Sequence, residues 1–267
     1  DGLRLQPDST ALLNLLANSQ LNHGLVDDAL QSYRRIIALA PHMAFVHSSL
    51  LLAMHYGSET DPAELFAEHQ RFGRTHTPPA LATRSFPNAP EPGRRLRIGY
   101  LSPDFKIHVM GLLMVEVIAR HDRARFEIFL YAIDGTDDAL TERFRAACDH
   151  YVRLDSPSSS DNARRIAADR LDLLVDLGGH MAGSRPLILA YKPAPVQITH
   201  LGYHGSLGLE NVDFKLTDAH ADLPGNAQFL LERLLPMDGC LMPFLRRAPS
   251  DHAATRAEMG IAEDRVV

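Results

Sequence analysis

The stretch LDLLVDL at residues 171–177 decides the class of the fold. It is an apolar run of strand length, and such a run suits a strand that is buried on both faces of its sheet. Sheets with two covered faces occur in proteins in which helices alternate with parallel strands. The residues on both sides of this stretch should therefore show that alternation.

The sequence predicts that strands and helices alternate from residue 96 to residue 201. Short apolar runs predict further strands at residues 96–101, 126–131, 151–154 and 195–201. Helical patterns lie between them at residues 109–119, 137–147, 162–169 and 186–190. This order predicts a Rossmann-like parallel sheet, and such sheets bind ligands at the carboxyl ends of their strands. The candidate site therefore comprises the loops at residues 102–111, 178–185 and 202–210.

The residues before this α/β region have a helical period. Apolar positions predict helices at residues 9–23 and 27–39, and Pro41 ends the second one. Pro7 and Pro41 are 34 residues apart, which is the period of a tetratricopeptide repeat. Ala17, Ala29 and Tyr33 fall where such a repeat carries its small and aromatic residues. A generic helical hairpin is the alternative interpretation.

A second, less regular helical unit comes next, at residues 45–56 and 62–72. Repeats of this kind are not stable alone, so the two units must continue upstream or dock on the α/β region. Proline-rich sequence then predicts an extended linker. The predicted domains are tetratricopeptide-like helices at residues 1–74, the linker at 75–95, the Rossmann-like lobe at 96–250 and the start of a further lobe at 251–267.

Composition disfavours several classes of partner. The net charge is −6 without a basic run, which argues against nucleic acid. Cys148 and Cys240 are far apart and form no metal-binding or redox motif, which fits a reducing, cytoplasmic setting. No apolar stretch approaches the 18 residues of a membrane span. The sequence leaves a homo-oligomer open.

Each of the three candidate loops carries a histidine: His108, His180 and His204. Asp104, in the first loop, is interpreted as a residue that caps a turn. His200 and His204 are four apart, but they flank the end of a strand, so the helical spacing of a metal-binding pair does not apply. We therefore expect no metal site.

The loops and the helical repeats together resemble the family of O-linked N-acetylglucosamine transferases and SPINDLY-type protein glycosyltransferases. The resemblance covers nearly the whole chain. The matching segments are RIGYLSPDF at residues 97–105 with His108, DLGGH at 176–180, KPAPVQ at 192–197, LGY at 201–203 and LTD at 216–218.

This resemblance implies a B-type glycosyltransferase fold, in which two nucleotide-binding-like lobes enclose the active cleft. The chain would be a fragment that holds the last helical repeats and the N-terminal lobe. The second lobe, which grips the nucleotide of the donor, would start near Val266. We therefore expect this piece to transfer no sugar alone.

The resemblance also implies an activity: transfer of a sugar from a nucleotide sugar to Ser or Thr of proteins that the repeats bind. His108 matches a family histidine that has been proposed as the base, and neutral imidazole can accept a proton near pH 7. The reaction would be an inverting single displacement without a metal, because the loops lack an Asp-x-Asp pair. No cofactor is expected beside the donor, UDP-N-acetylglucosamine or GDP-fucose.

The candidate substrate-binding residues are His180, Lys192, Tyr203, His204 and Gly205. The chain departs from the family at two places. Val109-Met110 stands where many members have Pro-Thr, and His204 stands where the third loop often has proline. These departures favour the alternative of a catalytically inactive scaffold that binds proteins through its repeats. A SPINDLY-like protein O-fucosyltransferase is a further alternative, because the residues that select the donor should lie in the second lobe. A nucleotide-sugar enzyme acting on small molecules is a third alternative, and it would leave the repeats without a role.

Overall fold

The computed structural model describes residues 2–78, 85–133, 135–244, 254–262 and 264–265. Val266 and Val267, where a further lobe was predicted to start, lie outside these residues. Parts of the predicted linker and of the two predicted domains after it, at 79–84 and 245–253, also lie outside them.

A parallel sheet of seven strands is the centre of the α/β region in the described residues. The strands are β1 Leu96–Ser102, β2 Phe126–Ala132, β3 His150–Arg153, β4 Leu173–Asp176, β5 Val196–Thr199, β6 Phe214–Thr217 and β7 Arg233–Pro236. Their spatial order is β3-β2-β1-β4-β5-β6-β7, and Ile98 of β1 lies opposite both Ile128 and Leu173. The predicted Rossmann-like parallel sheet is confirmed, and the strand order reverses between β1 and β4, where such sheets bind ligands.

The sequence prediction missed β6 and β7. β6 contains Lys215, which is 7% exposed because its ammonium group is paired with the Asp222 carboxylate at 2.7 Å. A lysine within a four-residue run hides the apolar pattern of a buried strand. β7 ends at Pro236 and lies at the edge of the sheet, where a missing backbone N–H is tolerated.

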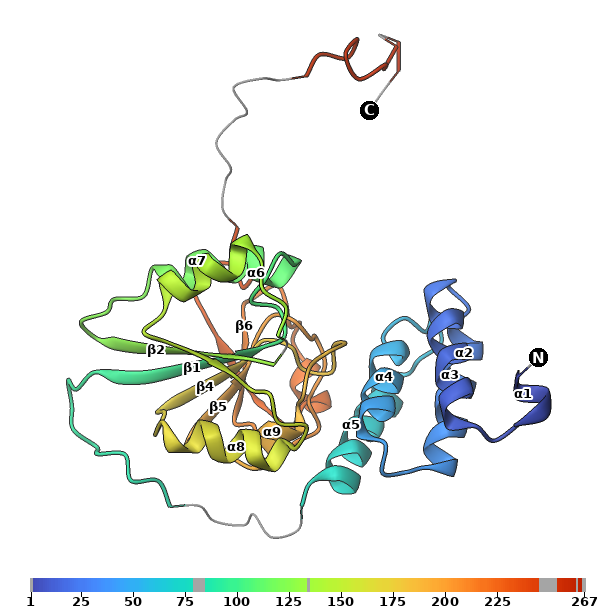
Figure 1. Cartoon of the computed structure of the whole chain (residues 1–267), viewed down its shortest axis with the longest axis horizontal. Coiled ribbons are helices and arrows are strands. Elements are labelled where there is room, and N and C mark those ends of the chain that lie inside the picture. Colours follow the sequence, from blue (N-terminus) through green and yellow to red (C-terminus); the bar gives the residue numbers. More distant parts are fainter. Residues whose placement is uncertain (1, 79–84, 134, 245–253, 263, 266–267) are drawn as a thin grey trace.

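Helices cover both faces of the sheet, as Figure 1 shows. α6 Val109–Ala119 and α7 Ala139–Ala147 lie on one face, and α8 Ser159–Ala168 and α9 Leu187–Ala190 lie on the other. Successive residues of one strand point to opposite faces of the sheet. Tyr100 accordingly packs in the core beneath α6 and α7, whereas Leu101 packs in the core beneath α8 and α9.

The front of the chain is helical, as predicted. Its helices are α1 Gly2–Leu5, α2 Thr10–Asn22, α3 Val26–Leu39, α4 Ala44–Met54 and α5 Pro62–His76, and a short 3₁₀ helix occurs much later at Asn226–Phe229. Ala17, Ala29 and Tyr33 are completely buried between α2, α3 and α4. Helix α5 extends four residues beyond its predicted end at 72, because the linker prolines begin only at Pro78.

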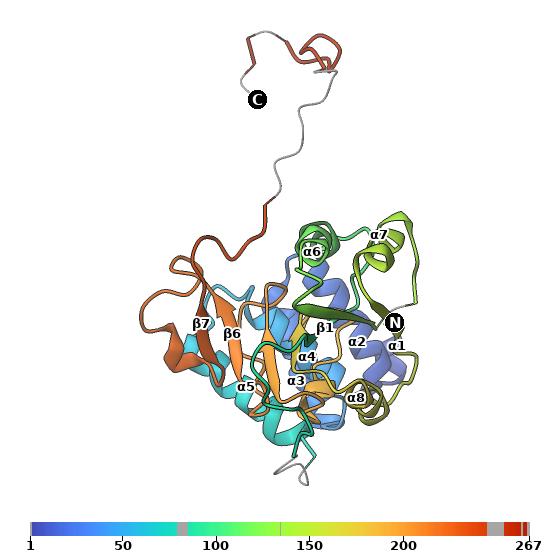
Figure 2. The same cartoon turned by 90° about the vertical axis from the view of Figure 1, so that its left-hand side faces the viewer.

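The helical region docks on the α/β lobe, which is one of the two outcomes expected for so short an array. Leu51 of α4 and Phe72 of α5 belong to the same apolar core as Leu189 and Leu207 of the lobe. Figures 1 and 2 show α5 close to the lobe and α2 and α3 farther out. The two regions therefore share one continuous core.

Candidate functional site

The loop after β1 is held rigidly at the switch point of the sheet. Helix α7 begins with a capping box, in which Asp138 binds the first backbone N–H groups of the helix. Asp138 also accepts a hydrogen bond from the Ile107 N–H at 2.6 Å, and Thr141 donates its hydroxyl to the Phe105 carbonyl at 2.8 Å. These contacts, led by the Ile107 N–H, hold the pKa of Asp138 below its usual range.

His108 ends this loop and caps the N-terminus of α6. Its Nδ1 lies 3.3 Å from the Met110 N–H and 3.4 Å from Oδ2 of Asp104. The His108 side chain is 44% exposed, whereas the Asp104 side chain is 14% exposed. The hydroxyl of Ser102 accepts the Asp104 N–H and caps this turn, and the predicted capping role of the Asp104 side chain stays a prediction. The imidazole therefore faces solvent at the edge where ligands of such sheets bind.

His180 and Tyr203 lie between the lobe and helices α4 and α5, and both are buried. His180 Nδ1 contacts the Ser48 hydroxyl at 2.9 Å, and its Nε2 contacts the Leu207 carbonyl at 3.1 Å. The Tyr203 hydroxyl lies 3.0 Å from His55 and 2.8 Å from His69. This placement argues against the substrate-binding roles predicted for His180 and Tyr203, because their polar atoms are used within the protein.

The partners of these rings determine which ring nitrogen carries the proton. A carbonyl can only accept, so His69 donates from Nδ1 to the Leu65 carbonyl, and its Nε2 accepts the Tyr203 O–H. Nε2 of His55 then donates to the Tyr203 oxygen. Burial lowers the pKa of His69 to about 3, lowers the pKa of His180 well below its usual range and raises the pKa of Tyr203. The imidazole rings of His69 and His180, which lie between the helices and the lobe, are thus neutral.

Replacing Tyr203 by phenylalanine tests this structural role. The variant leaves one buried acceptor on His69 and one donor on His55 without a partner, so we expect the free energy of unfolding to fall by about 1–3 kcal/mol. Denaturant titration of the chain measures the change, with the exposed Tyr56→Phe as the matched control. Unchanged stability, together with weaker substrate binding in the full-length protein, would restore the predicted substrate role.

Lys192 lies at the opposite edge of the sheet from the candidate loops. It precedes β5, and its ammonium group contacts Asp213, which precedes β6, at 2.5 Å. The ammonium also donates to the Asn211 carbonyl at 2.9 Å. Because ligands bind at the carboxyl edge, this ion pair argues against the predicted role of Lys192 in substrate binding and indicates a structural one.

His204 and Gly205 have different surroundings in the structure. The His204 side chain is exposed, so its predicted contact with substrate stays a prediction. Gly205 packs against the helical region: a Cβ atom there would lie 2.9 Å from His55 and 3.1 Å from His69. The absence of a side chain at Gly205 therefore leaves room for the imidazole rings of His55 and His69. This packing argues against the predicted substrate contact of Gly205.

Asp176, the last residue of β4, is a buried carboxyl group at the switch point. Its Oδ2 accepts the Gly179 N–H at 2.7 Å, whereas Oδ1 has no hydrogen-bond partner among the residues that the structure describes. Burial raises the pKa of Asp176 to about 6. The carboxyl group therefore holds the second loop through the Gly179 N–H, and solvent does not reach it.

The residues that position the site were not identified from the sequence. Asp138 and Thr141 could have been found, because Asp-x-x-Thr before an apolar run is an N-cap signal. Ser48, His55 and His69 carry no such signal, because their partners lie more than 130 residues away in the chain.

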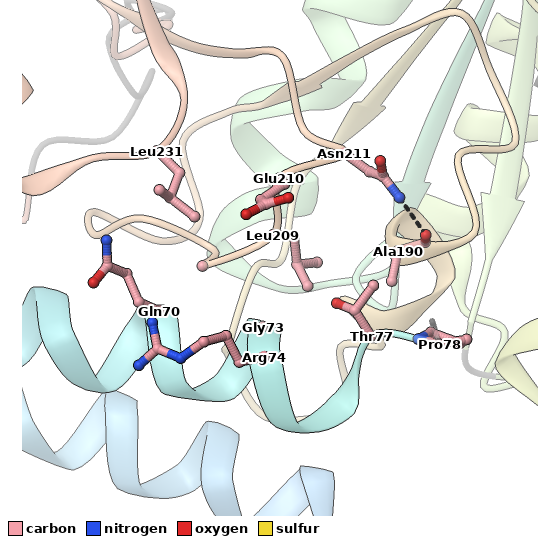
Figure 3. A pocket seen from close by; sticks show the side chains of 11 residues that line it. Gln70, Gly73, Arg74, Thr77, Pro78, Ala190, Leu209, Glu210, Asn211 and Leu231 are labelled. Carbon is pink, nitrogen blue, oxygen red and sulfur yellow. Dashed lines mark hydrogen bonds between the residues drawn. The ribbon is translucent and has the colours of Figure 1, made fainter. Parts of the chain in front are cut away.

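Two cavities lie near these elements. One of about 440 Å³ lies between α5 and the loop at 208–211, and Figure 3 shows Gln70, Arg74 and Glu210 around it. The other, of about 530 Å³, is lined mainly by apolar residues of α6, by Glu116 and Arg143, and by Pro243 and Phe244. The second cavity begins at Val109, next to His108.

Two further features are absent from the residues that the structure describes. No three His, Cys, Asp or Glu side chains are grouped there so that they could hold a metal ion. None of the described helices has both the length and the apolar character that crossing a membrane would require.

Comparison with known proteins identifies the family to which these elements correspond. The sequence model of glycosyl transferase family 41 matches residues 25–240. A protein of Arabidopsis thaliana named probable UDP-N-acetylglucosamine–peptide N-acetylglucosaminyltransferase SPINDLY is 33% identical over 207 residues, which are 76% of this chain and 22% of that protein. A protein of Caenorhabditis elegans named UDP-N-acetylglucosamine–peptide N-acetylglucosaminyltransferase is 38% identical over 131 residues, 48% of this chain and 11% of that one.

A solved structure agrees with these relatives. A mutant of the Thermobaculum terrenum O-GlcNAc transferase superposes with a TM-score of 0.87 and 30% identity, over 93% of this chain and 48% of that chain. The chain thus spans about a fifth of the length of the SPINDLY relative. The family match includes all of α3, α4 and α5, the His108 loop and the whole described sheet. From this match and the shared fold we conclude that the chain belongs to glycosyl transferase family 41.

Proposed function

We propose that this chain supplies the first lobe and the adjoining helices of a protein O-glycosyltransferase. N-acetylglucosamine is the sugar that the names of the relatives favour, and GDP-fucose is the alternative donor to be tested beside UDP-N-acetylglucosamine. The observation that carries the proposal is the position of His108. Its half-exposed imidazole is fixed at the carboxyl end of β1, at the switch point of a family 41 sheet.

His108 acts as the base in this proposal. The hydroxyl oxygen of an acceptor Ser or Thr forms a bond to the anomeric carbon, while the bond from that carbon to the nucleotide diphosphate breaks. The hydroxyl proton passes to His108, and the single displacement inverts the anomeric centre. The proposed mechanism uses no metal.

The helical region is proposed to carry acceptor proteins as a tetratricopeptide array. The burial of Ala17, Ala29 and Tyr33 in one core supports this proposal, and Leu15 of α2 is an apolar side chain that is 66% exposed. Because α4 and α5 are docked on the lobe, an acceptor bound to the helices would be presented in a fixed direction relative to His108. This arrangement gives the repeats a role that an enzyme for small molecules would not need.

Replacing His108 by alanine in the full-length protein is expected to reduce sugar transfer by about 10²–10⁴-fold, the usual contribution of a general base. His108 is exposed, and its polar contacts among the described residues are to Asp104 of its own loop and Met110 of the first turn of α6, so the fold should be retained. The rate of transfer to an acceptor peptide measures the effect. His150→Ala, at an exposed histidine of β3, is the control and should leave the rate unchanged.

The test of the function itself is intact-protein mass spectrometry of acceptor proteins incubated with the full-length protein. UDP-N-acetylglucosamine, GDP-fucose and UDP-glucose are supplied in parallel. A mass increase of one N-acetylhexosamine is expected, and an increase of one deoxyhexose would instead identify a fucosyltransferase. No increase with any donor, while specific proteins still bind to the helices, would support the scaffold alternative.

A further inference from the structure

The contact between Asp104 and His108 bears on how the proposed base works. Oδ2 of Asp104 lies on the Nδ1 side of the ring at 3.4 Å, so Nε2 is the ring nitrogen left for a substrate. The carboxylate is largely covered, whereas the imidazole is half exposed. This inference rests on the proposed function, because it concerns the state in which His108 meets an acceptor.

Two groups compete for Nδ1, and they require opposite states of that atom. The Met110 N–H, at 3.3 Å, needs a lone pair on Nδ1, whereas the Asp104 carboxylate needs a hydrogen there. Hydrogen bonds to an ionised acceptor are roughly twice as strong as those between neutral groups. The Met110 N–H belongs to the first turn of an exposed helix end, where water can replace the lost partner. The carboxylate should therefore decide the state of the ring.

The backbone around the pair keeps the two side chains together. Gly111 packs its α-carbon against the loop, and a Cβ atom there would lie 2.1 Å from the Lys106 carbonyl oxygen and 2.8 Å from that of Asp104. The Ser102 hydroxyl fixes the Asp104 N–H at 3.0 Å. Asp138 fixes the residue before His108 through the Ile107 N–H. The relative position of carboxylate and imidazole is thus set by the fold and does not need a substrate.

The geometry points to Asp104 as the positioning residue of the site, which keeps a hydrogen on Nδ1 of His108 and so presents Nε2 to the acceptor hydroxyl. When Nε2 takes the hydroxyl proton, the Asp104 carboxylate stabilises the imidazolium that forms. It thereby offsets the unfavourable charge at the N-terminus of α6. Without the carboxylate, the Met110 N–H would bind Nδ1 and Nε2 would carry the hydrogen, leaving no lone pair for the acceptor.

The state of the ring is measured on this chain by two-bond ¹⁵N–¹H correlation spectra of the histidine rings near pH 7.5. These spectra distinguish hydrogen on Nδ1 from hydrogen on Nε2. With 14 histidines in the chain, the His108 signals are assigned by their loss in His108→Gln. We expect hydrogen on Nδ1 in the wild type and in Asp104→Glu, and on Nε2 in Asp104→Asn. The matched control, Asp155→Asn, changes an exposed carboxylate after β3 and should leave the spectrum of His108 unchanged.

Transfer by the full-length protein is the second readout. Asp104→Asn should lower kcat at least tenfold with little change in the KM for the acceptor, Asp104→Glu should recover part of the rate, and the double variant with His108→Ala should be no slower than His108→Ala alone. Hydrogen on Nε2 in the wild type, or the same ring state in wild type and Asp104→Asn, would overturn the inference. If the ring state shifts as expected but His108→Ala transfers sugar normally, the proposed role of His108 fails while the positioning contact stands.

Discussion

Replacing Gly73 by alanine is expected to destabilise the chain by about 2–4 kcal/mol, although alanine is the better helix former by roughly 1 kcal/mol. A Cβ atom at Gly73 of α5 would lie 1.8 Å from the carbonyl oxygen of Gly208. Both sides of this contact are backbone, so no side chain can rotate away. Helix α5 would have to retreat from the loop, which would stretch the hydrogen bond between His69 and Tyr203.

Gly208 is the other half of the same contact and should behave in the same way. Its φ is +67°, and a Cβ atom there would lie 1.9 Å from the His69 carbonyl oxygen. Gly93→Ala is the matched control, since it has a φ of +83° with open space around it and should cost only about 1 kcal/mol of backbone strain. Guanidinium titration measures the free energy of unfolding of the Gly73, Gly208 and Gly93 variants. A Gly73→Ala variant as stable as the wild type would show that α5 does not lie this close to the lobe.

Acidification from pH 7 to pH 5 is expected to lower the free energy of unfolding by roughly 3 kcal/mol. Burial lowers the pKa of His69 to about 3 and of His200 to about 4, and lowers the pKa of His180 well below its usual range. In the unfolded chain these rings would titrate near pH 6.5. Below that pH the unfolded chain binds protons that the folded chain does not, so stability falls by up to about 1.4 kcal/mol per pH unit for each ring.

Two buried acids act in the opposite direction. Burial raises the pKa of Asp176 to about 6 and also raises that of Glu232, so the folded chain binds these protons first as the pH falls. They offset part of the loss, and the histidines dominate because more of them are buried. Guanidinium titrations at several pH values measure the slope, which His69→Gln should reduce and the exposed His42→Gln should not. A stability that is constant between pH 7 and pH 5 would contradict the neutral, buried rings.

The elements that were predicted well are those whose signal is local. The helix predicted at 109–119 has the same bounds as α6, and the apolar run at 171–177 contains β4. His108 was identified because it lies in the loop between a predicted strand and a predicted helix, and because it matches a histidine of the family that the sequence resembles. Periodicity, caps and prolines are properties of neighbouring residues, so one sequence is enough to recognise them.

The side-chain partners that the sequence did not reveal lie elsewhere in the chain. His180 and Tyr203 lie in polar, glycine-rich loops typical of ligand sites, yet their partners are Ser48, His55 and His69 of the helical region. Lys192 was a candidate for substrate binding from its sequence, but its ammonium group is paired with the Asp213 carboxylate. A residue type shows which bonds a side chain can make, but only the fold shows which of them are already made.

The shared core of α4, α5 and the lobe also sets where the protein can be divided. The proline-rich segment after α5 looks like the natural junction, but a cut there would separate Leu51 and Phe72 from the lobe residues that bury them. The junction between α3 and α4, at residues 40–43, lies in a turn, but Tyr33 and Ile36 of α3 share an apolar core with Leu50 of α4, which a new array would have to rebuild. A fusion to a foreign helical array should be joined there, because α4 and α5 then stay attached to the lobe. The helices before α4 could in that way be exchanged while the lobe keeps the two helices that complete its core.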